Sequence, residues 1–321
     1  MLQKIKLFLL LLLTFIPLNA LAYSDYIIAS GNNIGIKIET DGILVVGTYD
    51  INGHDPAAEA GLKAGDTIIY INDKKVRRID EVTRLISNNR ENSIIVGYIR
   101  DGMEFKTVLK LINNKTGLYL KDTVSGIGTL TYIDPTTKKF GALGHEIVNS
   151  VSGEIVDVAD GDIFTSSITS IVPSRDGSPG EKNASLNSND VIGNINENTN
   201  KGVFGFYSGE IPKSELYKVA TINEIKKGSA KIKTVLNGND VKEYDINIIN
   251  IRETEDKTKN IIFEIVDEEL LNETGGIIQG MSGSPIVQGK YIVGAVTHVV
   301  VNDTTKGYGI LITNMLEESE N

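Results

Sequence analysis

The chain has 321 residues, which is room for two globular domains of ordinary size. Hydrophobic residues make up 40% and charged residues 23% of the sequence, a balance typical of a folded protein and not of a disordered one. The formal net charge of -10 opposes binding to nucleic acid, and the lack of cysteine excludes disulfides, thiolate metal sites and cysteine nucleophiles. Many Ile, Val and Thr runs between 32 glycines predict a β-rich protein. Nothing in the sequence indicates a cofactor, and a chain with no Cys and three scattered His is not expected to bind a metal.

The N-terminus has the pattern of an export signal. Lys4 and Lys6 precede an apolar run over residues 7–18, and Ala20-Leu21-Ala22 has the small-x-small form of a signal-peptidase site. The apolar stretch is somewhat short for the ~20 residues that span a bilayer. Residues 1–22 are therefore expected to be a signal peptide or a membrane anchor, and the protein is expected to be exported, either secreted or anchored.

A first domain is expected over residues 30–113. Short β-like runs there are separated by glycines and interrupted by one helical stretch. The expected strands are residues 34–39, 42–46, 67–71, 93–100 and 104–111, and the expected helix is residues 80–88.

The segment from Ala57 to Asn72 resembles the PDZ pattern A-x-x-A-G-L-x-x-G-D-x-I-x-x-I-N at every fixed position. A PDZ domain adds an extended peptide as a strand to an open sheet edge and holds its terminal carboxylate with backbone amides. Ile34, Gly35 and Ile36 are the candidate peptide-binding residues, because a glycine there lets the backbone approach a ligand. His54, in the loop before the expected short helix, is interpreted as a solvated loop residue.

The second domain, residues 116–321, is expected to be a β-barrel, since its apolar runs alternate with Gly, Asn and Asp turns. Residues 174–188, rich in Ser, Gly, Asn and Pro, are expected to form a long exposed loop.

The candidate nucleophile is Ser282, in the segment Gly280-Met281-Ser282-Gly283-Ser284-Pro285. This segment resembles the G-x-S-G-G-P turn of chymotrypsin-like peptidases, which presents a serine hydroxyl and aims backbone N–H groups at one point. The amides of Gly280 and Ser282 are the expected oxyanion hole. Ser284 is interpreted as structural.

Serine needs a general base, and histidine is the usual one. Of the three histidines, His145 lies upstream of Ser282, as the order His, Asp, Ser of this superfamily requires. His298 follows the nucleophile in an apolar strand and is interpreted as a core or sheet-edge residue, with an accessory role near the specificity pocket as the alternative.

An acidic residue between His145 and Ser282 would orient the imidazole. Asp267 is favoured because residues 261–266 are expected to form a buried strand that could shield a carboxylate at its end. Asp256, Glu264 and Glu268 stay open on physical grounds alone.

Over nearly its whole length the chain resembles the stage IV sporulation protein B peptidases of endospore-forming bacteria, which are PDZ-containing serine peptidases. The resemblance is carried by matched segments throughout the second domain, and it implies a catalytic triad of His145, Asp267 and Ser282. The sequence departs from the family pattern at Glu146, where glycine is expected. The matched segments are residues 140–145, 178–182, 202–205, 266–271, 274–285, 294–299 and 306–309.

The resemblance implies a serine endopeptidase that self-cleaves in the forespore intermembrane space. It also implies cleavage of a membrane-bound inhibitor of an intramembrane protease, and so activation of the late mother-cell sigma factor. The partners expected are a protein substrate and a peptide or C-terminal tail in the PDZ groove. The alternatives are a general envelope PDZ protease, which the domain order disfavours, and a noncatalytic PDZ adaptor.

Overall fold

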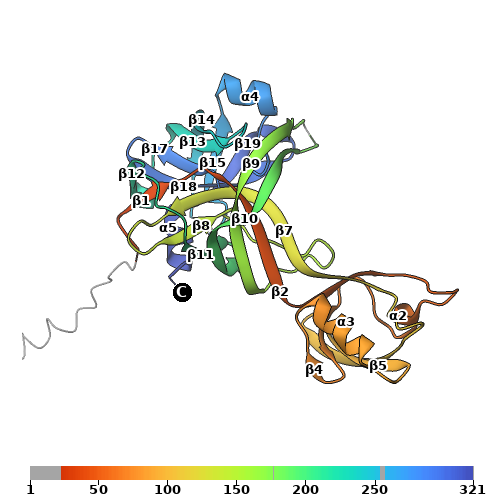
Figure 1. The fold of residues 1–321 in the computed structure, drawn as a ribbon. Coiled ribbons are helices and arrows are strands. Elements are labelled where there is room, and N and C mark those ends of the chain that lie inside the picture. Colours follow the sequence, from red (N-terminus) through yellow and green to blue (C-terminus); the bar gives the residue numbers. More distant parts are fainter. Residues whose placement is uncertain (1–22, 176, 254–256, 321) are drawn as a thin grey trace, which may run out of the picture.

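The computed structural model describes residues 23–175, 177–253 and 257–320 and shows a mostly β protein with a PDZ unit set apart from a larger body (Figure 1). This confirms the predicted fold class and the PDZ unit. The predicted signal or anchor, residues 1–22, lies outside the described residues. Within the described ranges, no helix has the length and apolar character needed to cross a membrane.

The elements follow one another along the chain as a long series of strands with few helices. The strands are β1 (Tyr26–Ala29), β2 (Asn33–Thr48), β3 (Thr67–Ile71), β4 (Lys74–Lys75), β5 (Ser93–Arg100), β6 (Met103–Lys110), β7 (Leu118–Ile133), β8 (Lys139–Ala142), β9 (Val158–Val172), β10 (Gly180–Thr199), β11 (Gly202–Tyr207), β12 (Leu216–Val219), β13 (Gly228–Val235), β14 (Val241–Ile251), β15 (Ile261–Ile265), β16 (Ile278–Gln279), β17 (Pro285–Gln288), β18 (Tyr291–Val300) and β19 (Asp303–Leu311). The helices are α2 (Pro56–Glu59), α3 (Ile79–Ser87), the 3-10 turn η1 (Ile222–Glu224), α4 (Glu268–Thr274) and α5 (Ile312–Glu318).

The larger body contains a first barrel of six antiparallel strands. β2 pairs with β7, β7 with β8, β8 with β11, β11 with β10, β10 with β9, and β9 again with β2, so the ring closes. Closure leaves no free edge in this ring. Its interior holds Ile34, Ile36, Ile38, Phe140 and Ile163.

A second barrel of the same kind follows. β13 pairs with β14, β14 with β15, β15 with β19, β19 with β18, β18 with β17, and β17 with β13. Inward residues alternate with outward ones along β14, as a strand buried on one face requires. Two antiparallel barrels in sequence are the arrangement expected for the predicted chymotrypsin-like domain.

The PDZ unit is inserted into the first barrel. β2 and β7 each run through both: their outer parts pair with each other in the PDZ unit, and their inner parts are barrel strands (Figure 1). β1 also pairs with β7 and with β12 of the larger body. Residues 26–39 thus belong to the peptidase body, although the domain predicted from sequence as PDZ begins at residue 30.

Turn residues account for the tight hairpins of the PDZ unit. β5 and β6 are joined at Arg100↔Met103 by Asp101 and Gly102, both with positive φ, 50° and 72°. An Asp-Gly pair is the preferred two-residue connection, because this turn needs positive φ at both positions. The predicted strands 67–71 and 93–100 match β3 and β5 at both ends.

One sequence expectation about the larger body is wrong. Residues 174–188 were expected to form a long loop, but β10 begins at Gly180 and pairs with β9 and, in parallel, with β16. Polar residues occupy this strand because many of its side chains face solvent. The exposed loop is therefore much shorter than its composition indicates.

Candidate active site

The two candidate catalytic residues are carried by different barrels. His145 follows β8 of the first barrel, and Ser282 lies in the turn between β16 and β17 of the second. The two segments meet, since a Cβ at Gly283 would lie 2.9 Å from Cα of Leu143. The structure thus brings the His145 segment and the Ser282 turn together at the junction of the barrels.

β7 holds the Ser282 turn in place through three hydrogen bonds. The hydroxyls of Thr129 and Thr131 donate to the carbonyls of Gly280 and Gly283 at 2.8 and 2.7 Å, and the Thr129 N–H donates to the Ser282 carbonyl at 3.1 Å. Gly280 and Gly283 both have φ of +91°. A Cβ at Gly283 would lie 2.1 Å from the carbonyl oxygen of Thr129, so only glycine fits there.

The predicted oxyanion donors are available. Among the described residues, no acceptor takes the N–H of Gly280 or of Ser282, whereas the N–H of Gly283 donates to the Val296 carbonyl. Two free backbone donors beside a serine hydroxyl are what stabilisation of a tetrahedral oxyanion needs. Ser284 is fully buried, so its hydroxyl cannot compete as a nucleophile.

The Ser282 hydroxyl donates to the Thr297 carbonyl at 3.0 Å and makes no hydrogen bond to His145. Attack on a substrate requires the hydroxyl to exchange this carbonyl for the imidazole, a rotation about the Cα–Cβ bond of Ser282. Catalytic hydrogen bonds are commonly loose without substrate and tighten when it binds.

His145 sits at the end of a turn built from left-handed residues: Leu143 has φ of 66° and Gly144 has φ of 70°. Leucine in that region is strained, and such strain clusters at active sites. The ring contacts the Glu146 carbonyl through Nδ1 at 2.7 Å. Because a carbonyl only accepts, Nδ1 carries the proton and Nε2 keeps its lone pair, the tautomer required of a general base.

His298 lies beside His145, with ring centroids 5.4 Å apart and planes tilted by 45°. Its pKa is lowered, first by desolvation and then by the charges of His145 and Lys259, while Glu146 opposes the shift. His298 is therefore neutral at pH 7 and adds no positive charge that would oppose protonation of His145. This places His298 beside the candidate general base, and its accessory role near a specificity pocket stays a prediction.

Asn198, at the end of β10, fixes the segment after His145, and sequence reasoning missed it. Its side chain accepts from the Ile147 N–H at 2.8 Å and donates to the Ile147 and Val156 carbonyls, each at 2.8 Å. These bonds hold the loop that follows His145 against the first barrel. An Asn among many others in a polar strand carries no sequence signal for this role.

Asp267 is not in contact with His145. It is the N-cap of α4, and its carboxylate accepts from the N–H groups of Leu270 and Asp245 at 3.0 and 3.1 Å. The register sets Ile262 opposite Tyr308, and Tyr308 opposite His298. Asp267 follows the end of β15 and lies five residues beyond Ile262, about 16 Å along an extended chain at 3.3 Å per residue. Asp267 is therefore far from the level of His298 and of the neighbouring His145.

The other acidic alternatives lie elsewhere as well. Glu264 is on β15 opposite Lys306, and Glu268 is an exposed residue in the first turn of α4. Asp256 is outside the described residues. In this structure the group that accepts from His145 Nδ1 is the Glu146 carbonyl, and Asp267 does not occupy the triad position predicted for it.

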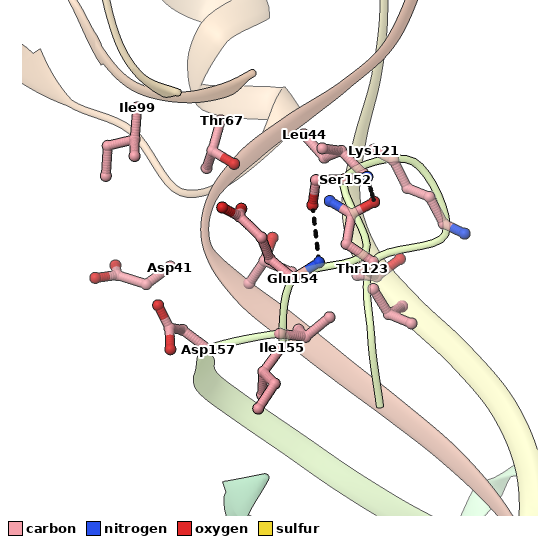
Figure 2. A pocket seen from close by; sticks show the side chains of 14 residues that line it. Asp41, Leu44, Thr67, Ile99, Lys121, Thr123, Ser152, Glu154, Ile155 and Asp157 are labelled. Atoms are coloured by element: carbon pink, nitrogen blue, oxygen red, sulfur yellow. Dashed lines mark hydrogen bonds between the residues drawn. The ribbon is translucent and has the colours of Figure 1, made fainter. Parts of the chain in front are cut away.

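The loop after His145 also reaches the PDZ unit. A pocket lies between them, lined by Thr67 and Ile99 of the PDZ unit and by Glu154 and Ile155 of the loop, and Figure 2 shows the Glu154 side chain directed toward Thr67. The loop is shaped by its own hydrogen bonds, among them the Ser152 hydroxyl accepting from the Glu154 N–H. The segment carrying the candidate base is thus held by Asn198, and the loop that follows it lines a pocket shared with the PDZ unit.

Ile34, Gly35 and Ile36 do not form the PDZ groove, which corrects the sequence prediction. They lie in the inner part of β2, paired with β7 on one edge and with β9 on the other. Ile34 and Ile36 are buried in the first barrel. No sheet edge is free there, so no peptide strand can be added.

A groove with the required form lies between α3 and the outer part of β7. Residues 118–121 of β7 pair with β2 on one edge only, and the other edge faces α3. The floor and wall include Val82 and Ile86 of α3 and Leu118 and Leu120 of β7. Lys115 is exposed at one end and forms no ion pair with a described residue. This fits an extended peptide with a terminal carboxylate.

No group of three or more His, Asp or Glu side chains suited to a metal ion occurs among residues 23–175, 177–253 and 257–320.

Comparison with known proteins gives two family matches. The SpoIVB peptidase S55 family profile matches residues 112–316, and the PDZ domain profile matches residues 32–111. A curated relative, "Probable protease eep" of Enterococcus faecalis (strain ATCC 700802 / V583), is 29% identical over 112 residues. That match spans 34% of this chain and a quarter of the length of the relative.

Among solved structures, two crystal structures of the inactive form of the Rv3671c protease from M. tuberculosis H37Rv are similar, at 11% and 13% identity. They cover 60% and 61% of this chain and 82% and 85% of their own, with a TM-score of 0.32 for each. Such TM-scores are too low to carry an argument about the fold.

Proposed function

The chain belongs to the SpoIVB peptidase S55 family and is a serine endopeptidase with a PDZ unit, and from this premise we propose that it is an exported enzyme of endospore formation. We propose that it cleaves itself and a membrane-bound regulator of an intramembrane protease. Cleavage of the regulator then leads to activation of the late mother-cell sigma factor. The family resemblance and the export pattern of residues 1–22 support this proposal.

Ser282 is the proposed nucleophile and His145 the proposed general base. The observation that carries this assignment is the geometry of the turn. Hydrogen bonds from Thr129 and Thr131 fix the turn, and the Gly280 and Ser282 amides stay free beside the Ser282 hydroxyl. Ser282 Oγ attacks the peptide carbonyl carbon as its proton passes to His145 Nε2. The oxyanion forms at the Gly280 and Ser282 amides, and His145 returns the proton to the leaving amine.

After the amine leaves, water completes the reaction. His145 takes a proton from water as the water oxygen attacks the acyl carbon, and the second tetrahedral intermediate collapses as His145 returns that proton to Ser282 Oγ, which frees the enzyme and the acid product. The neutral His298 beside His145 permits the imidazolium to form twice in each cycle without a neighbouring positive ring.

The PDZ groove between α3 and β7 is proposed to recruit the C-terminal tail of a substrate or of another copy of the protein. Residues 118–121 supply an open strand edge, and Lys115 supplies a positive charge at the end of the groove. Such docking raises the local concentration of a cleavage site near Ser282.

The test is mass spectrometry of the exported protein and of its Ser282→Ala variant, each incubated alone and then with an unfolded protein such as reduced casein. We expect fragments in the wild type that are absent from the variant. A reactive fluorophosphonate should add to wild-type Ser282 only.

Intact masses for both proteins, with no fluorophosphonate adduct, would contradict the assignment of Ser282 and favour a noncatalytic adaptor. A normal adduct without self-cleavage would leave the nucleophile in place and remove the self-processing part of the proposal. The sporulation role is tested separately, by whether Ser282→Ala in the native host blocks spore formation after engulfment.

A further inference from the structure

Lys182 is a fully buried lysine that the catalytic steps above do not use. It lies on β10, its side chain is 2% exposed, and Nζ donates to the Thr234 hydroxyl at 2.8 Å. No carboxylate pairs with it among the described residues. A buried ammonium without a counterion is costly, so its retention calls for a reason.

The side chain of Lys182 lies against the Ser282 turn. A Cβ at Gly280 would lie 3.1 Å from Cδ, 3.3 Å from Cγ and 3.2 Å from Cβ of Lys182. The parallel pairing of Gly180 with Ile278 brings the two segments together. Nζ is two bonds, about 2.5 Å, beyond Cδ, so it lies within about 6 Å of the same point on Gly280.

We propose that Lys182 is a positioning residue of the active site, whose stem supports Gly280 and whose buried ammonium stabilises the negative charge that develops at the amides of Gly280 and Ser282. The proposal rests on the assignment of Ser282 and of the oxyanion hole made above. The charge acts through the protein and not by touching substrate. In a site shielded from water, a unit charge about 6 Å from an oxyanion changes the rate by a factor of about 10 to 100.

The surroundings of Lys182 leave its charge free to act on the turn. Lys182 pairs with Ile171 on β9, contacts Gly280 after β16 and donates to Thr234 on β13, and none of these three residues titrates. Desolvation lowers the pKa of Lys182 to about 7. The ammonium is therefore partly protonated near neutrality, and its contribution is present at low pH and lost as the pH rises through about 7.

Lys233 is a matched control on the same strand as Thr234. Its Nζ donates to the Ala29 carbonyl at 2.8 Å, and desolvation lowers its pKa as well. Adjacent residues of a strand face opposite sides, so Lys233 points away from Lys182 and the Ser282 turn. It packs beside the Tyr217 ring instead.

The experiment measures the rate of fluorophosphonate addition to Ser282, by intact mass, in wild type, Lys182→Met and Lys233→Met from pH 6 to 9. The Ser282 Oγ–P bond forms, the P–F bond breaks, fluoride leaves, and the hydroxyl proton passes to His145. Methionine keeps the stem against Gly280 and removes the charge. We expect Lys182→Met to react about 10- to 100-fold more slowly than wild type at pH 6.5. The reagent concentration that gives half of the maximal rate should be unchanged. Lys233→Met should react at the wild-type rate.

In wild type the rate should fall as the pH rises through about 7, where Lys182 loses its proton, and only Lys182→Met should lack this fall. A Lys182→Met protein with the wild-type rate and pH profile would overturn the proposal. If that variant does not fold, the wild-type profile decides, because a rate that does not fall between pH 6 and 8 contradicts the role of the charge. A wild type that does not react at all would instead sink the assignment of Ser282.

Discussion

The two ends of β7 differ in how many neighbours each has. Residues 118–121 pair with β2 on one edge and leave the other edge open toward α3. At the other end, Leu130, Tyr132 and Ile133 pair with β8, while β1 and β2 cover the opposite edge. An open edge can accept a peptide strand. A strand paired on both edges cannot, but its side chains can hold a neighbouring segment in place.

The difference shows how one strand serves two purposes. At the closed end, Thr129 and Thr131 are fully buried, and their hydroxyls point at the Ser282 turn. At the open end the strand is half-exposed. Catalysis needs a preorganised turn, and recognition of a tail needs a free backbone edge. The predictions below separate the two ends, beginning with the largest effect.

Gly283→Ala should slow fluorophosphonate addition by at least about 100-fold. A Cβ there would lie 2.1 Å from the Thr129 carbonyl oxygen, so the turn and its two free amides must move. Gly102→Ala is the control: its φ is 72°, but a Cβ there meets nothing within 4 Å. It should cost about 1 kcal/mol of folding stability and leave the rate unchanged. Equal rates in both variants would show that the turn is not preorganised by β7.

Thr129→Val should slow the same reaction about 10-fold. It removes the donor to the partly buried Gly280 carbonyl and leaves that acceptor unpaired, which costs about 1–3 kcal/mol, while nearly keeping the side-chain volume. Thr129→Ser retains the hydroxyl and should recover most of the rate. Identical defects in both variants would attribute the loss to packing and not to the hydrogen bond.

Lys115→Glu should weaken binding of a peptide with an apolar C-terminal residue about 5- to 10-fold, measured by fluorescence polarisation. The exposed ammonium lies at the end of the groove, where a terminal carboxylate is expected. Lys110→Glu makes the same charge change on β6 outside the groove and should bind as wild type does. If a peptide amide binds as well as the free acid, the position of the carboxylate is wrong.

Asp267→Asn should change the addition rate by less than about 3-fold. Asparagine caps a helix as well as aspartate does, so α4 should keep its stability. If Asp267 instead moves to His145 during catalysis, as the triad implied by the family requires, the rate should fall about 10,000-fold. Thermal unfolding of the same variant shows whether any loss arises from the helix cap.

The sequence alone identified the elements that depend on local pattern. The PDZ segment from Ala57 to Asn72, strands β3 and β5, and the glycine turn around Ser282 follow from turn residues and strand periodicity over short stretches. The choice of His145 over His298 needed only chain order, and His54 was set aside because it lies in the predicted PDZ domain. The family resemblance then assigned the peptidase class, which the match over residues 112–316 confirms.

Tertiary structure alone decided which strand edge is free and which buried groups meet. Ile34-Gly35-Ile36 and Leu118-Tyr119-Leu120 are both short apolar strands, and only closure of the first barrel shows that the former has no open edge. Asn198 and Lys182 come near the catalytic turns through pairings between segments far apart in sequence. Such roles carry no local signature, because hydrogen-bond partners and burial depend on the whole chain.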